Sequence, residues 1–99
     1  MEKPAYFVFN VKVMNPEGMK PYQEKVLATV TAFNGVPVVA GGAIEVREGE
    51  APKGRTIIVR FNSMADARAW YDSPAYQAII GYRIASAECS AYLLEGIAI

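Results

Sequence analysis

Histidine is absent from the 99 residues of the chain. Histidine is the commonest general base and metal ligand and the usual proximal haem ligand. Its absence removes the serine–histidine and cysteine–histidine nucleophilic arrangements and nearly every transition-metal site. We therefore expect no metal and no cofactor, and any chemistry must rest on carboxylates, tyrosines or arginines.

The chain also lacks paired cysteines and an excess of either charge. Cys89 is the single cysteine, which excludes an internal disulfide and a CxxC site. Ten basic and ten acidic residues give a net charge of zero, and no two basic residues are adjacent, so we expect no nucleic-acid partner. The apolar segment 5–14 is too short to span a membrane and has no cleavage site after it. We expect a cytoplasmic protein without a membrane partner.

Hydrophobic residues, in contrast, are abundant for a chain of this length. They make up 53% of the sequence, against 20% charged residues. A chain of 99 residues supports one core, so we expect a single domain over residues 1–99. This composition gives more apolar surface than a small monomer usually hides, which favours self-association.

The first half of the chain predicts a strand, a helix and a second strand. Residues 6–13 alternate apolar and polar side chains, as strands do. After "MNPEG", apolar residues recur every three or four positions, which predicts a helix with Pro21 in its first turn and Gly35 at its end. "VPVVAGGAIEV", residues 36–46, predicts a long strand with a bulge at its paired glycines.

The second half predicts a strand, two consecutive helices and a final strand. "RTIIVRF" ends at Ser63, which is a good helix N-cap with an acidic residue three positions later. Ser73 and Pro74 interrupt the helix that follows and begin a second one, which runs to about Arg83. "ECSAYLLEG", residues 88–96, alternates again and predicts the fourth strand.

The resulting order βαββαβ predicts an α+β, ferredoxin-like fold, in which a four-stranded antiparallel sheet carries its helices on one face. The opposite face also carries apolar or amphipathic residues: Tyr6, Val8, Ile58, Tyr92 and Leu94. Because a solvated face would be polar, we expect two sheets to pack together in a homodimer. Asn10 is expected to bond across that interface. Glu45, Arg47 and Arg60 are expected to form a cross-strand ion pair within the dimer.

Several motifs are similar to those of a known family. The most specific is "FNSMADARAWYDSPAYQAIIGYR", and "AYFVFNVKV", "NPEGMKPY" and "AGG" are weaker. Through them the chain resembles the bacterial family catalogued as the thirteen-thirty domain of unknown function, in the dimeric α+β barrel superfamily. The resemblance implies a dimeric α+β barrel. Cofactor-free monooxygenases, lactone isomerases and haem enzymes share this superfamily, so the fold alone does not fix an activity.

The segment "WYDSPAYQAIIGYR", residues 70–83, holds the only tryptophan and three of the six tyrosines. Helical spacing places Arg83 on the same apolar stripe as Tyr76, so the aromatic residues are expected to fill the core. The guanidinium needs an acceptor, and an internal Asp or Glu is favoured over the carboxylate of a ligand. If the sheet and the helices enclose a ligand pocket, we expect it to be lined by Tyr22, Trp70, Tyr71, Tyr76 and Arg83.

Two kinds of function fit these residues. The first is an uncharacterised homodimer that binds a small anionic or aromatic metabolite between sheet and helices, or acts on it as a cofactor-free, monooxygenase-like or isomerase-like enzyme. The second is a purely structural dimeric module. An anion site at Arg83 favours the first hypothesis, and a packed core with Arg83 paired to a carboxylate favours the second. The sequence leaves open whether the protein is an enzyme.

Overall fold

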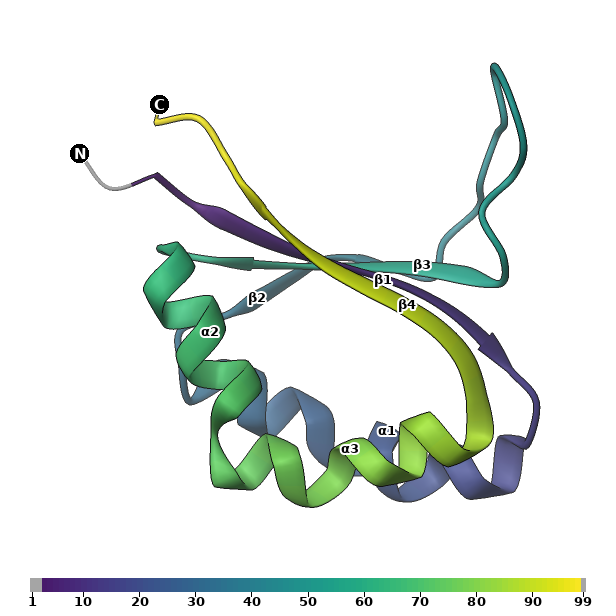
Figure 1. Cartoon of the computed structure of the whole chain (residues 1–99), viewed down its shortest axis with the longest axis horizontal. Helices are drawn as coiled ribbons and strands as arrows, with labels where there is room; N and C mark the ends of the chain where they lie inside the picture. The colour runs from purple at the N-terminus through teal and green to yellow at the C-terminus, as the bar shows by residue number, and fades with distance from the viewer. Residues whose placement is uncertain (1–2, 99) are drawn as a thin grey trace.

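The computed structural model describes residues 3–98. Along the chain lie β1 (Ala5–Val13), α1 (Pro16–Thr31), β2 (Val36–Ala40), β3 (Arg55–Phe61), α2 (Met64–Asp72), α3 (Pro74–Ser86) and β4 (Ala87–Glu95). The strands pair antiparallel in the order β2-β3-β1-β4, and the helices cover one face of the sheet (Figure 1). The predicted ferredoxin-like α+β fold is confirmed. None of the described helices is both long and apolar enough to cross a membrane.

Serine caps divide the second helical region as predicted. The Asp66 N–H donates to Ser63 Oγ at 3.1 Å and begins α2. The Tyr76 N–H donates to Ser73 Oγ at 3.2 Å, so Ser73 ends α2 and begins α3. Because of this break at Ser73, the segment from Trp70 to Arg83 lies along the sheet as two helices. The break therefore determines where the aromatic rings of the segment lie.

Helix α1 begins earlier than predicted. Asn15 is its N-cap and accepts a 3.2 Å hydrogen bond from the Gly18 N–H, and Pro16 occupies the first turn. Pro21 therefore lies inside the helix, and its predicted place in the first turn is wrong. The Asn-Pro pair is itself a strong helix start, because asparagine caps and proline needs no hydrogen-bond partner there.

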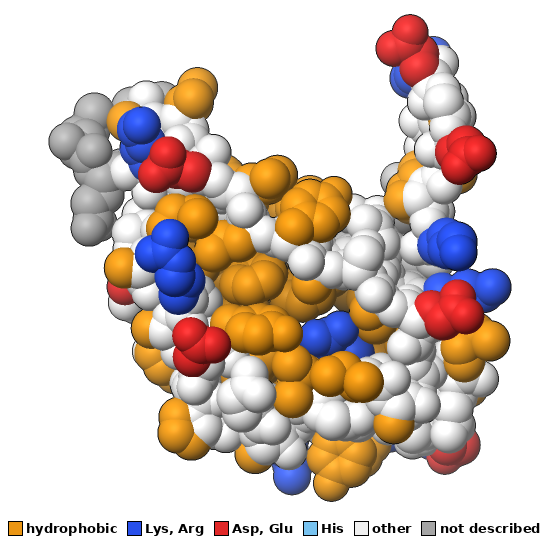
Figure 2. Space-filling model, viewed as in Figure 1, with side chains coloured by type: hydrophobic (Ala, Val, Ile, Leu, Met, Phe, Trp, Pro, Cys, Tyr) orange, Lys and Arg blue, Asp and Glu red, His pale blue; other side chains and the backbone are white. Residues whose placement is uncertain are grey.

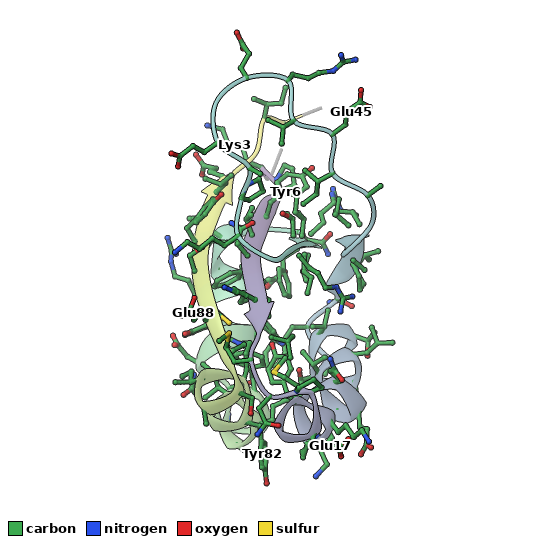
Figure 3. The ribbon with its side chains drawn as sticks, turned by 90° about the vertical axis from the view of Figure 1, so that its right-hand side faces the viewer. Lys3, Tyr6, Glu17, Glu45, Tyr82 and Glu88 are labelled. Carbon is green, nitrogen blue, oxygen red and sulfur yellow. The ribbon has the colours of Figure 1, made fainter. Side chains whose placement is uncertain are left out.

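Strand β2 is shorter than predicted. It ends at Ala40, and its register shifts between Pro37 and Val39, so the predicted bulge at the paired glycines is wrong. Gly41 instead turns the chain with a φ of 78°, and its N–H bonds to the Thr56 carbonyl at 2.9 Å. Residues 42–54, called the arm below, leave the sheet and rise on the side opposite the helices (Figure 1). Glu45 marks the arm in Figure 3.

The two sheet faces differ in the exposure of their apolar side chains. Alternate residues of β1 and β3 point toward the helices and are buried there: Phe7, Phe9, Val11, Val59 and Phe61. On the opposite face, called the bare face below, Tyr92 and Leu94 are each 48% exposed, whereas Val8 on the central strand β1 is 7% exposed. The chain therefore packs one side of its sheet and leaves apolar side chains accessible on the other.

Polar residues of the bare face bond within the sheet. The Thr56 hydroxyl donates to Asn10 Oδ1 at 2.9 Å, and Asn10 Nδ2 donates to the Ser90 hydroxyl at 3.5 Å. Within one chain, Asn10 therefore bonds to neighbouring strands on both sides, and a bond across a dimer interface stays a prediction.

Within one chain, two of the three residues expected to form an ion pair do so along the arm, and pairing within a dimer stays a prediction. Arg47 lies 3.6 Å from Glu45, and both side chains are exposed on the arm. Arg60 lies on β3 and forms no ion pair with any residue between 3 and 98. The alternation of residues 43–47 therefore reflects an extended arm and not a paired strand.

Candidate functional site

A pocket of about 330 Å³ lies between α1 and the helix-facing side of the sheet. It forms because α1 packs mainly against α3 and so leaves space over β2 and β3. Hydrophobic side chains gather between sheet and helices in Figure 2, where the surface is hollowed. The buried walls of the pocket are Phe9, Val11, Met19, Tyr22, Val30, Val59, Trp70 and Arg83. Its exposed rim includes Gln23, Leu27, Pro37, Ala40 and Arg55.

Arg83 brings a buried cation to this apolar pocket. Its side chain reaches the pocket from the last turns of α3 and is only 4% exposed. No Asp or Glu among residues 3–98 forms an ion pair with it, and its buried Nε has no hydrogen-bond partner there. The predicted pairing with an internal carboxylate is therefore wrong.

Aromatic rings partly compensate the charge of Arg83. Its guanidinium carbon lies 5.3 Å from the ring centroid of Phe9 and 5.8 Å from that of Tyr22, within the range of cation–π attraction. Burial acts to lower the pKa of Arg83, but the neighbouring Tyr76 hydroxyl acts in the opposite direction, and the net pKa is raised. The guanidinium is a cation at any physiological pH.

Two tyrosine hydroxyls meet beside this cation. Tyr22 of α1 and Tyr76 of α3 share a buried hydrogen bond of 2.8 Å between their hydroxyl oxygens. Burial raises the pKa of both phenols, while the charge of Arg83 acts to lower it. Both hydroxyls are therefore protonated at neutral pH. One O–H is used within the pair, and the other can donate to a third group.

Trp70 forms the inner end of the pocket and the centre of the aromatic core. Its ring centroid lies 4.1 Å from Tyr76 and 5.3 Å from Phe61, and its side chain is 1% exposed. Its indole N–H donates to the Thr29 hydroxyl at 3.1 Å, which satisfies the polar end of the ring.

The five candidate residues take three different positions. Tyr22, Trp70 and Arg83 line the pocket. Tyr76 is fully buried behind them and reaches the site through its bond to Tyr22. Tyr71 stacks on Phe7 at a centroid distance of 5.3 Å and does not line the pocket.

Most of the pocket wall was not identified from the sequence as lining a site. Met19 and Val26 belong to the apolar positions that recur along α1, and Ile57 and Val59 belong to β3. The same spacing is expected whether such a residue touches another side chain or an open pocket. Arg55, at the rim, is the first residue of β3, and nothing in the sequence around it indicates that it lines a pocket.

The family of the chain follows from a match along nearly its whole length. Residues 4–97 match the family described as "Domain of unknown function (DUF1330)". The chain belongs to this family. The resemblance to this family in residues 61–83 is therefore confirmed. The family description assigns no activity. No curated protein matches the chain.

Solved structures share the fold at low sequence identity. A protein of unknown function from Rhodopseudomonas palustris, RPA0582, has 16% identity and a TM-score of 0.75, over 100% of this chain and 86% of that one. SnoaB from Streptomyces nogalater, described as a cofactor-independent oxygenase, has 12% identity and a TM-score of 0.62, over 98% and 96%. A protein from Thermobifida fusca, described as dimeric and ferredoxin-like, has 10% identity and a TM-score of 0.55, over 96% and 92%.

Proposed function

We propose that this member of the DUF1330 family is a cytoplasmic homodimer that binds a small anionic or aromatic metabolite in the pocket between α1 and the sheet. The observation that carries the proposal is Arg83, a buried cation without a carboxylate partner among residues 3–98. An unpaired charge in an apolar interior is costly, and an arriving anion would remove that cost. The candidate ligand-binding residues are Tyr22, Trp70 and Arg83, supported by Tyr76.

The structure argues against a purely structural role for Arg83. A structural arginine in a core pairs with a carboxylate or with carbonyl oxygens, as buried charges do. Arg83 instead has cation–π contacts with Phe9 and Tyr22, no carboxylate partner among residues 3–98, and a place in the lining of an open pocket.

Catalysis without a cofactor is the second candidate function. Arg83 and a phenol O–H could stabilise negative charge on a bound substrate, and SnoaB, which shares the fold, is described as a cofactor-independent oxygenase. Such a reaction also needs a base. No Asp or Glu lines the pocket within the described chain, and the raised pKa of the Tyr22 and Tyr76 phenols keeps both protonated, so neither is available as a base at neutral pH. Binding is therefore the better supported function.

Exposed apolar residues support the homodimer. Tyr92 and Leu94 on the bare face, and Ile44 and Val46 on the arm beside it, are each between 45% and 48% exposed. A second sheet packed on this face would lie about 10 Å away and would cover these side chains. The neighbour from Thermobifida fusca, which shares the fold, is described as dimeric.

A thermal-shift screen with small carboxylic acids and aromatic metabolites tests the proposed pocket. We expect at least one anionic compound to stabilise the protein, and Arg83→Met to lose that response. The unliganded variant is expected to melt at the same temperature or higher, because methionine keeps apolar volume and removes an unpaired buried charge. Arg68→Met, which removes an exposed arginine of α2 outside the pocket, is the control and should respond like the parent protein.

Two results would contradict the proposal. One is a screen in which no compound stabilises the parent protein. The other is an Arg83→Met variant that responds to the anion as strongly as the parent does.

A further inference from the structure

The charge, the donors and the walls of the pocket restrict its ligand to a narrow chemical class. Resting on the proposed function, we infer that the ligand is a monocarboxylate with an apolar body of about ten non-hydrogen atoms. Its carboxylate would bind the Arg83 guanidinium and the free phenol O–H of the Tyr22–Tyr76 pair. The apolar body would lie along α1 and β3.

The number of buried charges sets the charge of the ligand. Arg83 is the one charged residue among the buried walls, since the other arginine that lines the pocket, Arg55, is exposed at the rim. A single negative charge on the ligand neutralises Arg83. A second negative charge on the same head group would be buried without a cation, and such a charge is strongly disfavoured.

The geometry of the donors sets the shape of the head group. A guanidinium offers two parallel N–H donors in one plane, which match the two oxygens of a planar carboxylate. Arg83 lines the pocket and has no carboxylate partner among residues 3–98, so its donors are not committed to an internal anion. The phenol O–H that the Tyr22–Tyr76 bond leaves free supplies a third donor. A carboxylate has lone pairs for all three.

The walls set the nature of the rest of the ligand. Apart from Arg83 and the Tyr22 hydroxyl, the buried walls are hydrophobic or aromatic side chains. A polar ligand body would lose its hydration there without gaining partners. The pocket volume of about 330 Å³, compared with roughly 30 Å³ for a water molecule in the liquid, accommodates on the order of ten non-hydrogen atoms.

Burial also orients the ligand. Arg83 is 4% exposed, whereas Gln23, Leu27 and Arg55 at the rim are open to solvent. The carboxylate therefore enters first and the body extends toward the rim. A longer body could leave through the rim, but a larger head group could not reach Arg83.

Three ligands of nearly equal shape test this inference by isothermal titration calorimetry. Phenylacetate carries one negative charge, phenylacetamide is its neutral counterpart, and benzylphosphonate in its dianionic form carries two charges. We expect phenylacetate to bind at least about tenfold more tightly than phenylacetamide, a difference of about 1.4 kcal/mol. We also expect it to bind more tightly than benzylphosphonate, although the latter carries more charge.

Variants of the protein test whether the preference for phenylacetate comes from Arg83. Arg83→Met should bind phenylacetate and phenylacetamide equally, because the cation that separates them is gone. Arg83→Lys should keep part of the preference, since it retains the charge but not the paired donors. Val26→Phe, which fills the pocket from α1, should weaken all three ligands. Arg68→Met should bind like the parent.

The outcomes separate this inference from the proposed function. If phenylacetamide or benzylphosphonate binds as tightly as phenylacetate, and Val26→Phe weakens both, the pocket binds ligands but the monocarboxylate assignment is overturned. If none of the three binds, the assignment is also overturned, and the wider screen decides the proposed function. If the tenfold preference survives in Arg83→Met, the carboxylate lies elsewhere and the inference is wrong.

Discussion

Leu94→Glu is expected to convert the proposed homodimer into a monomer. Leu94 lies opposite Tyr6 in the pairing of β1 with β4, next to Tyr92 on the same bare face. In a sheet-to-sheet dimer, the new carboxylate would be buried twice, once from each protomer. Such a burial costs several kcal/mol, and each 1.4 kcal/mol weakens association about tenfold. Size-exclusion chromatography with light scattering at micromolar concentration measures the result.

A matched variant on the helix layer controls for the added negative charge. Ile84 of α3 is 64% exposed on the helix layer, away from the bare face. Ile84→Glu adds the same carboxylate at an exposed apolar position and should remain dimeric. A parent protein that is monomeric at micromolar concentration, or a Leu94→Glu variant that stays dimeric, would show that the bare face is not the interface.

Trp70→Ala is expected to cause a large loss of folding stability. The indole is 1% exposed and has ring contacts with β1, β3 and α3, through Phe7, Phe61 and Tyr76. Replacing a buried tryptophan by alanine leaves a cavity and costs about 3–5 kcal/mol, a large part of the stability of a small domain. Urea unfolding followed by circular dichroism measures the loss, at one protein concentration because a dimer gains stability with concentration.

Two further variants serve as comparisons for Trp70→Ala. Trp70→Phe keeps most of the ring volume but removes the N–H that donates to Thr29, so it should cost distinctly less than the alanine variant. Tyr82→Ala removes a ring that is 46% exposed and points away from the sheet in Figure 3, and it should change stability by about 0.5 kcal/mol or less. Equal losses for Trp70→Ala and Tyr82→Ala would contradict the central position of Trp70.

The fold could be predicted because its signals are local. Alternation along β1, β3 and β4 and the caps at Ser63 and Ser73 each depend on a few adjacent residues. The path of residues 41–54 depends on pairing with other strands. The alternation of Ile44 and Val46 resembled a strand, but Gly41 turns the chain away from β3 before the strand can continue. Local periodicity does not show whether an extended segment has a pairing partner.

The candidate site could be predicted only in part, for a similar reason. Helical spacing correctly placed Arg83 on the same buried stripe of α3 as Tyr76. Whether a carboxylate faced Arg83 depended on how α1 and the sheet pack around α3. Only the three-dimensional arrangement shows that no acidic residue among residues 3–98 pairs with the guanidinium and that an open pocket lies beside it.

The side-chain N–H resonance of Arg83 tests the central claim most directly. The guanidinium lines the pocket and has no carboxylate partner among residues 3–98, so a bound carboxylate would be its first anionic partner and would change the environment of its Nε–H. In a proton–nitrogen correlation spectrum tuned to arginine Nε, the resonance is assigned by its loss in Arg83→Lys. We predict a large downfield proton shift on addition of phenylacetate, and no such shift with phenylacetamide. A resonance that stays in place while phenylacetate binds would contradict the account.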